Sequence, residues 1–144
     1  MIRPARAEDA GALATLELDA FGSDAWSPAQ VEAELAGATR RVMVAEADGR
    51  VIGYGAISIA GDVADLTRIV VTESRRRAGV ASALLAALHD AAARAGVERM
   101  LLEVAESNVD ARAFYATHEY AEISRRRGYY GDGDDALVLA RAVP

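Results

Sequence analysis

Residues 66–115 read LTRIVVTESRRRAGVASALLAALHDAAARAGVERMLLEVAESNVDARAFY, and this stretch decides the fold. A β-branched run at 69–71 leads into three arginines and a turn of small residues at 78–81. The apolar spacing over 79–95 predicts a long helix that ends at Gly96, a residue suited to the left-handed cap position. The order strand, turn and helix predicts a ligand site at the turn.

The segments around this stretch predict an α+β domain with a mixed, largely antiparallel sheet. Ser27, Pro28 and Gln30 form a well-defined helix start, and Asp48-Gly49 predicts a hairpin between two strands. We expect strands at 2–4, 41–47, 50–59, 63–71, 100–104, 121–127 and 136–142, and helices at 8–21, 28–36, 79–95 and after Asn108.

The length and composition indicate one soluble domain over residues 1–144. Hydrophobic residues make up 52% of the chain and charged residues 26%, and no apolar run approaches the roughly 20 residues of a membrane span. The first residues, MIRPAR, lack the apolar core of a signal peptide. The absence of cysteine excludes disulfides and a cysteine nucleophile. We expect a cytoplasmic protein without membrane contact.

The formal net charge is −6, which argues against nucleic acid as a partner and is compatible with a basic peptide or an amine. The arginines at 75–77 form a local basic run within this acidic chain. A solvated approach to the helix is one interpretation of this run. The alternative is that the run belongs to an anion site.

The turn at 76–81 has the features of a phosphate site. Its small side chains allow close approach of a ligand to the backbone. The first N–H groups of the following helix have no partner within the helix, and the helix dipole adds partial positive charge there. Arginines add charge-assisted hydrogen bonds. A tight turn without any ligand remains the alternative.

The sequence R-x-x-G-x-A at Arg76, Gly79 and Ala81 resembles the acyl-CoA motif of the GCN5-related N-acetyltransferases, Q/R-x-x-G-x-G/A. The resemblance spans nearly the whole chain and is closest to the bacterial ribosomal-protein alanine N-acetyltransferases. Further residues that support it are Trp26-Ser27, Leu102-Glu103-Val104, Ser107-Asn108, Tyr115, Arg126-Arg127-Gly128-Tyr129-Tyr130 and 135–139.

The resemblance implies a single GNAT domain with about seven strands and about four helices, and acetyl-CoA as the acetyl donor. It also implies the N-terminal alanine of the eighteenth small-subunit ribosomal protein as the acceptor. A monomer or weak dimer is expected. The cofactor-binding residues that it implies are Ile69, Val70, Val71, Arg76, Arg77, Ala78, Gly79, Val80, Ala81, Ser82 and Asn108.

Glu103 and Tyr115 are the candidate catalytic residues. An α-amino group has a pKa of about 7.7–8.0, so a carboxylate, directly or through water, is a sufficient base. A phenol can protonate the leaving thiolate. Asn108 and Tyr115 are seven positions apart, which places them on one helix face about 10 Å apart. The alternatives are an ion pair of Glu103 with Arg99 or Arg68, and a core role for Tyr115.

Acceptor contacts are expected from Trp26, Tyr129 and Tyr130, since exposed aromatic residues favour interfaces. A core role for Trp26 is the alternative. His89 and His118 are expected to have packing or surface roles. The acidic residues at 132, 134 and 135 resemble part of a calcium loop that lacks its terminal glutamate, so we expect no metal site.

One departure from the family pattern follows Tyr115. Relatives usually continue with a leucine-glycine-phenylalanine turn, and this chain has His118-Glu119-Tyr120. The change puts a side chain into a turn where glycine accommodates positive φ. Besides N-terminal acetylation, two functions stay open: acetylation of a small amine or a protein lysine, and non-catalytic acyl-CoA binding.

Overall fold

The computed structural model describes residues 1–131 and 133–143 and contains a seven-stranded mixed sheet with four α-helices. The strand order is β1-β2-β3-β4-β5-β7-β6, and only β4 and β5 run parallel. The strands are β1 (Ile2–Pro4), β2 (Arg40–Ala47), β3 (Arg50–Ala60), β4 (Val63–Val71), β5 (Arg99–Ala105), β6 (Ala121–Arg126) and β7 (Ala136–Ala142). The helices are α1 (Ala10–Phe21), α2 (Pro28–Ala36), α3 (Val80–Arg94) and α4 (Val109–Thr117).

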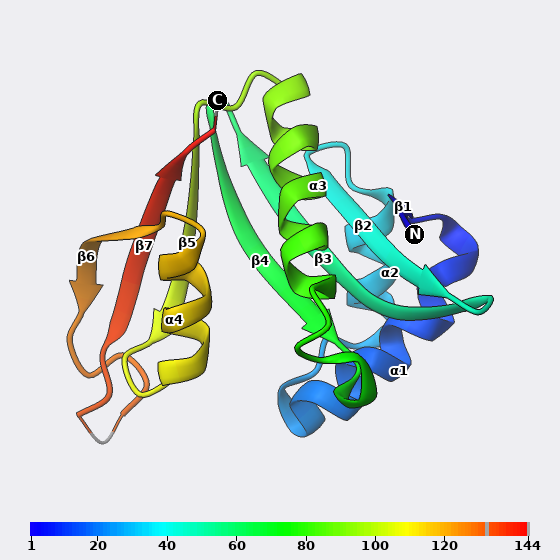
Figure 1. The fold of residues 1–144 in the computed structure, drawn as a ribbon, viewed down its shortest axis with the longest axis horizontal. Coiled ribbons are helices and arrows are strands. Elements are labelled where there is room, and N and C mark those ends of the chain that lie inside the picture. Colours follow the sequence, from blue (N-terminus) through cyan, green and yellow to red (C-terminus); the bar gives the residue numbers. More distant parts are fainter. Residues whose placement is uncertain (132, 144) are drawn as a thin grey trace.

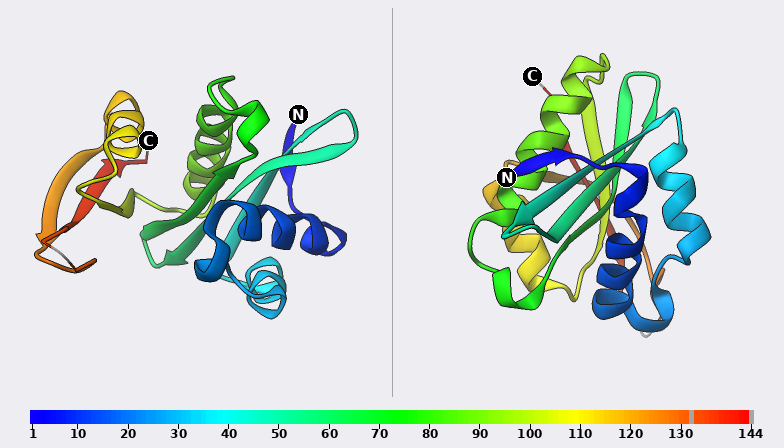
Figure 2. Two further views of the ribbon diagram at one scale, coloured as in Figure 1. Left: turned by 90° about the horizontal axis from the view of Figure 1, so that it is seen from below. Right: turned by 90° about the vertical axis from the view of Figure 1, so that its right-hand side faces the viewer.

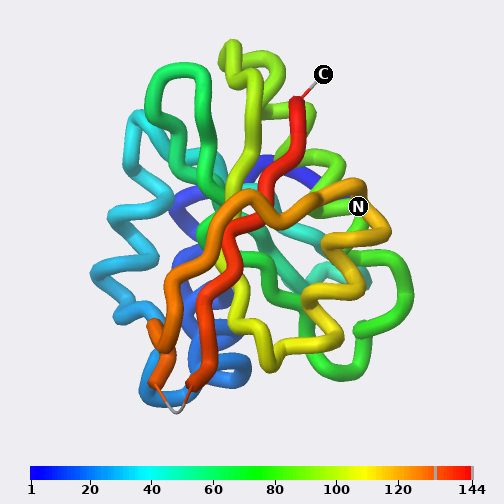
Figure 3. Tube along the Cα trace, turned by 90° about the vertical axis from the view of Figure 1, so that its left-hand side faces the viewer, coloured from blue at the N-terminus to red at the C-terminus, as the bar shows by residue number. Residues whose placement is uncertain are grey.

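The helices cover both faces of the sheet: α1 and α2 pack on one face, and α3 and α4 lie on the other (Figures 1 and 2). Seen from the side of the last hairpin, β6 and β7 lie side by side, and β7 runs beside β5 (Figure 3). The predicted α+β fold is therefore confirmed. Within the described part of the chain, no helix is both long enough and apolar enough to cross a membrane.

Local signals account for most element boundaries. Ser27 caps α2 with Gln30 in a reciprocal capping box, as predicted. The predicted hairpin turn is also present, because Asp48 and Gly49 have φ values of 53° and 74°. The start predicted for α1 was two residues early, since the chain first forms a 3₁₀ turn at Ala7–Asp9.

The glycines of β3 mark close approaches between elements. A Cβ atom on Gly53 would lie 2.7 Å from the carbonyl oxygen of Val70, and one on Gly55 would lie 2.7 Å from Cδ1 of Leu88 on α3. The ladder between β2 and β3 also shifts register beside Gly53. β3 therefore combines a register shift with close approaches at its glycines.

The sheet opens between its two parallel strands. Residues Val63 to Asp65 of β4 pair with Arg99 to Leu101 of β5, and from Leu66 onward β4 pairs with β3 alone. The two strands diverge beyond this point (Figure 1). Backbone polar groups on the β5-facing edge of β4 are therefore available to a ligand.

Candidate active site

A cavity of about 370 Å³ lies where β4 and β5 diverge. It brings together five residues that the sequence predicted for the site: Ile69, Glu103, Asn108, Tyr115 and Tyr130. Its remaining lining residues are Phe21, Leu66, Thr67, Arg68, Leu102, Val104, Ala105 and Ala111. The cavity therefore joins the predicted cofactor strand, both catalytic candidates and one acceptor candidate.

Tyr115 enters this cavity from α4 and is 8% exposed. Its ring packs edge-on against Phe114 and Tyr120, with centroid separations of 5.2 and 5.6 Å. Burial raises the pKa of its phenol to about 12 because the surroundings disfavour the phenolate. The hydroxyl is thus protonated at neutral pH, which is the state that a proton donor requires.

Glu103 lies on β5, and its side chain is 33% exposed. One carboxylate oxygen is 3.1 Å from Nη2 of Arg126, which β6 carries. The ion-pair partners that the sequence suggested, Arg99 and Arg68, were wrong. Because β7 lies between β5 and β6, the pairing depends on the strand order and not on local sequence.

Tyr130 approaches the same cavity from the loop between β6 and β7. Burial raises the pKa of its phenol, and the carboxylate of Glu103 raises it further. Tyr129 is 55% exposed and contacts Tyr130 edge-on, with the guanidinium of Arg126 at 5.3 Å from its ring centroid. The two tyrosines thus lie near Glu103 on the solvent side.

Asn108 caps α4, with its side-chain oxygen accepting the N–H of Ala111 at 3.2 Å. This bond uses the oxygen of the amide and leaves the NH₂ group available to a ligand. Asn108, directly before α4, and Tyr115, on α4, both line the cavity.

The turn before α3 has the geometry expected of an anion cradle. Arg77 and Gly79 both have positive φ, 63° and 82°, and no side chain caps the helix N-terminus. The first helical bond is donated by Ala83 to the carbonyl oxygen of Gly79, so the preceding N–H groups of the first turn have no helical partner. Arg76 Nε donates to the carbonyl oxygen of Val71 and places this arginine beside the end of β4.

Acetyl-CoA fits this arrangement. A Cβ added to Gly79 would meet no atom within 4 Å, so the backbone there is open to close approach. The phosphates would lie against the turn and its arginines, and the acyl end would lie against β4 where β5 has diverged. The residues predicted to carry these contacts remain Ile69, Val70, Val71, Arg76, Arg77, Ala78, Gly79, Val80, Ala81, Ser82 and Asn108.

Trp26, the third acceptor candidate, is not among the residues that line the cavity. Its ring packs against Tyr54 and lies 4.5 Å from the guanidinium carbon of Arg68. Among the lining residues that the sequence did not predict for the site are Phe21 and Arg68. A signal that could have pointed to Arg68 is its charged side chain within a strand that is mostly apolar.

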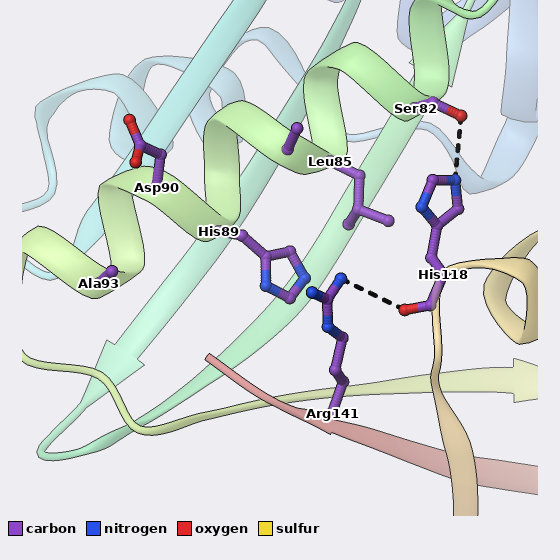
Figure 4. Close-up of a pocket in the computed structure, with 8 residues that line it drawn as sticks. Ser82, Leu85, His89, Asp90, Ala93, His118 and Arg141 are labelled. Carbon is purple, nitrogen blue, oxygen red and sulfur yellow. Dashed lines mark hydrogen bonds between the residues drawn. The ribbon is translucent and has the colours of Figure 1, made fainter. Parts of the chain in front are cut away.

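A second cavity, of about 300 Å³, lies between α3, the end of α4 and β7 (Figure 4). Ser82 Oγ and His118 Nε2 are 3.0 Å apart, so this contact connects the first turn of α3 to the end of α4. His89 is 8% exposed and lies 2.7 Å from the hydroxyl of Tyr120. Burial, and then the charge of Arg141, lowers the pKa of His89 to about 4. These contacts confirm its packing role.

The turn that departs from the family pattern has the predicted strain. Glu119 has a φ of 68°, in the region that glycine occupies readily. Tyr120 N donates to the carbonyl oxygen of Tyr115 at 3.1 Å, which closes the end of α4. The substitution therefore keeps the turn at the cost of backbone strain.

No group of three or more potential metal ligands occurs within residues 1–131 and 133–143. Asp132 lies outside the described residues. Asp134 accepts hydrogen bonds from the backbone and hydroxyl of Ser107. Asp135 accepts from Gly128 N and Arg125, contacts that hold the pKa of its carboxyl below the usual value. Both carboxylates thus serve to hold the β6–β7 loop.

Residues 11–120 match the Acetyltransferase (GNAT) family. An N-alpha-acetyltransferase RimI from Mycobacterium tuberculosis is 34% identical over 139 residues, which cover 92% of this chain and 86% of that protein. An uncharacterized N-acetyltransferase from Methanocaldococcus jannaschii is 35% identical over 102 residues, which cover 70% of this chain and 65% of that protein.

Among solved structures, the ribosomal-protein-S18-alanine N-acetyltransferase from Escherichia coli superposes with a TM-score of 0.88 at 27% identity. The superposition covers 99% of this chain and 93% of that one. The fold, the cofactor turn and these matches agree. The chain belongs to the GNAT acetyltransferase family.

Proposed function

We propose that this protein is an acetyl-CoA-dependent N-terminal protein acetyltransferase, and that its acceptor is the N-terminal alanine of the eighteenth small-subunit ribosomal protein. The observation that carries the proposal is the single cavity that joins Glu103, Asn108 and Tyr115 beside the open edge of β4. The alanine acceptor is inferred from the likeness to the ribosomal-protein-S18-alanine N-acetyltransferase from Escherichia coli. Acetylation of an α-amino group is also supported by the likeness to the N-alpha-acetyltransferase RimI from Mycobacterium tuberculosis.

Acetyl-CoA supplies the acetyl group as a thioester when it is bound. The turn at 76–82 holds its phosphates through main-chain amides and arginines, and Asn108 supplies an amide donor from α4. Backbone groups on the open edge of β4 polarise the acyl oxygen. These contacts orient the donor before the acceptor arrives.

Glu103 accepts the proton of the acceptor amine, directly or through water, as the amine nitrogen attacks the acyl carbon. Tyr115 donates its phenolic proton to the sulfur as the carbon–sulfur bond breaks. This proton is present at neutral pH, since the ordinary pKa of a tyrosine is 10.0 and burial raises the pKa of Tyr115 to about 12. An α-amino acceptor suits this mechanism, because its pKa of about 7.7–8.0 leaves part of it neutral without help.

The exposed Tyr129 and Tyr130 favour a peptide acceptor, because Tyr130 lines the cavity and Tyr129 packs against it, which adds aromatic surface beside the cavity. The test is mass spectrometry of acetylation over four acceptor groups: alanine-initiated peptides, peptides with another first residue, N-terminally blocked lysine peptides and small amines. We expect the fastest acetylation on alanine-initiated peptides. Preference for lysine or a small amine would refute the acceptor, and absence of product with every group would indicate a non-catalytic acyl-CoA-binding protein.

A further inference from the structure

A β-bulge at Thr67 determines which way Arg68 faces. The ladder pairs Leu66 with Ile57 and Arg68 with Ala56, so Thr67 is the extra residue of β4. Leu66 packs in the core beneath α3, whereas Val70 packs in the core beneath α1 and α2. Without the bulge, residues two apart would share one face. The bulge therefore turns Arg68 toward α1.

On that face Arg68 is held by the end of α1 and the segment that follows it, residues 21–26. Its Nε atom lies 3.1 Å from a carboxylate oxygen of Glu17, whose side chain is fully buried. Its guanidinium carbon lies 4.4 Å from the ring centroid of Phe21 and 4.5 Å from that of Trp26. The guanidinium plane of Arg68 thus contacts both aromatic residues of the segment.

Glu17 secures the same segment through its backbone. Its carboxylate accepts the N–H of Trp26 at 2.8 Å and also accepts the hydroxyl of Tyr54. Glu17 and Arg68 therefore hold residues 21–26 at both the main chain and the rings. The segment has no helix of its own beyond a short 3₁₀ turn, Gly22–Asp24, so these contacts replace secondary structure in fixing it.

Arg68 and Phe21 line the cavity that holds Glu103 and Tyr115. We propose that Arg68 is a positioning residue that holds segment 21–26, so that its first residue, Phe21, forms the acceptor-side wall of this cavity, and that Arg68 thereby sets the affinity for the acceptor peptide. The proposal rests on the proposed function and adds the part of the site that recognises the peptide. Since Glu17 neutralises the guanidinium, Arg68 acts here through its planar contacts and not through a free charge.

The test compares Arg68→Lys with Arg3→Lys. Lysine keeps the positive charge but loses the planar contact with two rings. Arg3 is a matched control, because its side chain is 13% exposed and pairs with Asp9 and Glu46 on the β1 side of the sheet, away from the cavity. We expect Arg68→Lys to raise the KM for an alanine-initiated peptide about tenfold, with kcat and acetyl-CoA affinity within about twofold of wild type.

Trp26 supplies a readout that does not depend on activity, because it is the one tryptophan of the chain. If Arg68 holds the segment, acrylamide quenches Trp26 fluorescence more strongly in Arg68→Lys than in wild type. In the control Arg3→Lys, acrylamide should quench Trp26 fluorescence to the same extent as in the wild type. Glu17→Gln, which keeps a hydrogen-bond acceptor for Trp26 but loses the charge, provides a second variant with the same expected direction in both assays.

The two assays separate the proposals. A wild-type enzyme that acetylates the peptide, together with an Arg68→Lys KM within about twofold of wild type, overturns the role of Arg68 and leaves the proposed function standing. A wild-type protein that acetylates no alanine-initiated peptide refutes the proposed function, and Trp26 quenching then decides the positioning role by itself. Equal KM changes in Arg68→Lys and Arg3→Lys overturn the assignment as well.

Discussion

At the scale of single residues, the proposed chemistry depends on a protonated phenol at Tyr115. Tyr115→Phe keeps the ring that packs against Phe114 and Tyr120 but removes the proton donor. We expect kcat to fall by about 10²–10⁴-fold, the usual contribution of a positioned acid. Steady-state kinetics with the best acceptor peptide measures this loss, and a kcat within threefold of wild type would remove Tyr115 from the mechanism.

The pKa of Tyr115 adds a check on the folded state. Burial raises it from 10.0 to about 12, so the folded state holds this proton more tightly than the unfolded state does. The corresponding stability is present below pH 10 and is lost as the pH rises from about 10 to about 12. Thermal melts of Tyr115→Phe across this window should therefore fall less steeply than those of the wild type.

Glu119 offers a stabilising substitution, because its φ of 68° suits glycine better than a side chain. Its contact with Arg141 is 3.8 Å long and its side chain is 81% exposed, so the lost ion pair costs little. We expect Glu119→Gly to raise the free energy of unfolding by about 0.5–1 kcal/mol, or about 2–4 °C in Tm. Differential scanning calorimetry measures the change, and a lower Tm would show that the turn is not strained.

At the scale of elements, β3 packs so closely that its glycines have no room for a side chain. A Cβ atom on Gly53 would lie 2.7 Å from a backbone oxygen of β4, which cannot move without disturbing the ladder. Gly53→Ala should lower stability by about 1–3 kcal/mol. Gly11→Ala is the matched control, since a Cβ there meets no atom within 4 Å. Denaturant unfolding measures the stability of both variants, and equal unfolding midpoints would contradict the packing argument.

The elements themselves were largely predictable from the sequence, because their signals are local. The capping box at Ser27, the Asp48-Gly49 turn and the left-handed Gly96 placed boundaries to within a few residues. The bulge at Thr67 was not predictable, since no residue type demands it there. It alone decides that Arg68 faces Glu17, so neither the ion pair nor the acceptor-side wall followed from periodicity.

In the site, too, features with local sequence signals were predictable and features set by the strand order were not. Glu103, Asn108 and Tyr115 were predicted together because each lies on an element with a clear local pattern and matches a family motif. The partner of Glu103 was missed, because Arg126 reaches it across β7 and the order β5-β7-β6 is a property of the whole sheet. Contacts between strands distant in sequence need the topology, and sequence patterns predict strands better than their order.

At the scale of the whole molecule, an acidic chain carries one basic turn for an anionic cofactor. The net charge is −6, so Arg76 and Arg77 concentrate positive charge where α3 adds its dipole. Acetyl-CoA at about 100 times its Kd should stabilise the fold by about 2.7 kcal/mol, a rise in Tm of about 5–10 °C. Because exposed charges are screened, this rise should shrink as salt increases at constant ligand concentration.

The matched variants are Arg77→Gln and Arg94→Gln, at opposite ends of α3. Arg94 pairs with Asp90 on the solvent side, so its loss leaves the cofactor turn unchanged. We expect Arg77→Gln to weaken acetyl-CoA binding about threefold, the effect of one exposed cation, with a smaller salt dependence than the wild type. Titration calorimetry at two ionic strengths measures both quantities. Equal affinities in the two variants would show that the charge at position 77 contributes nothing to acetyl-CoA binding.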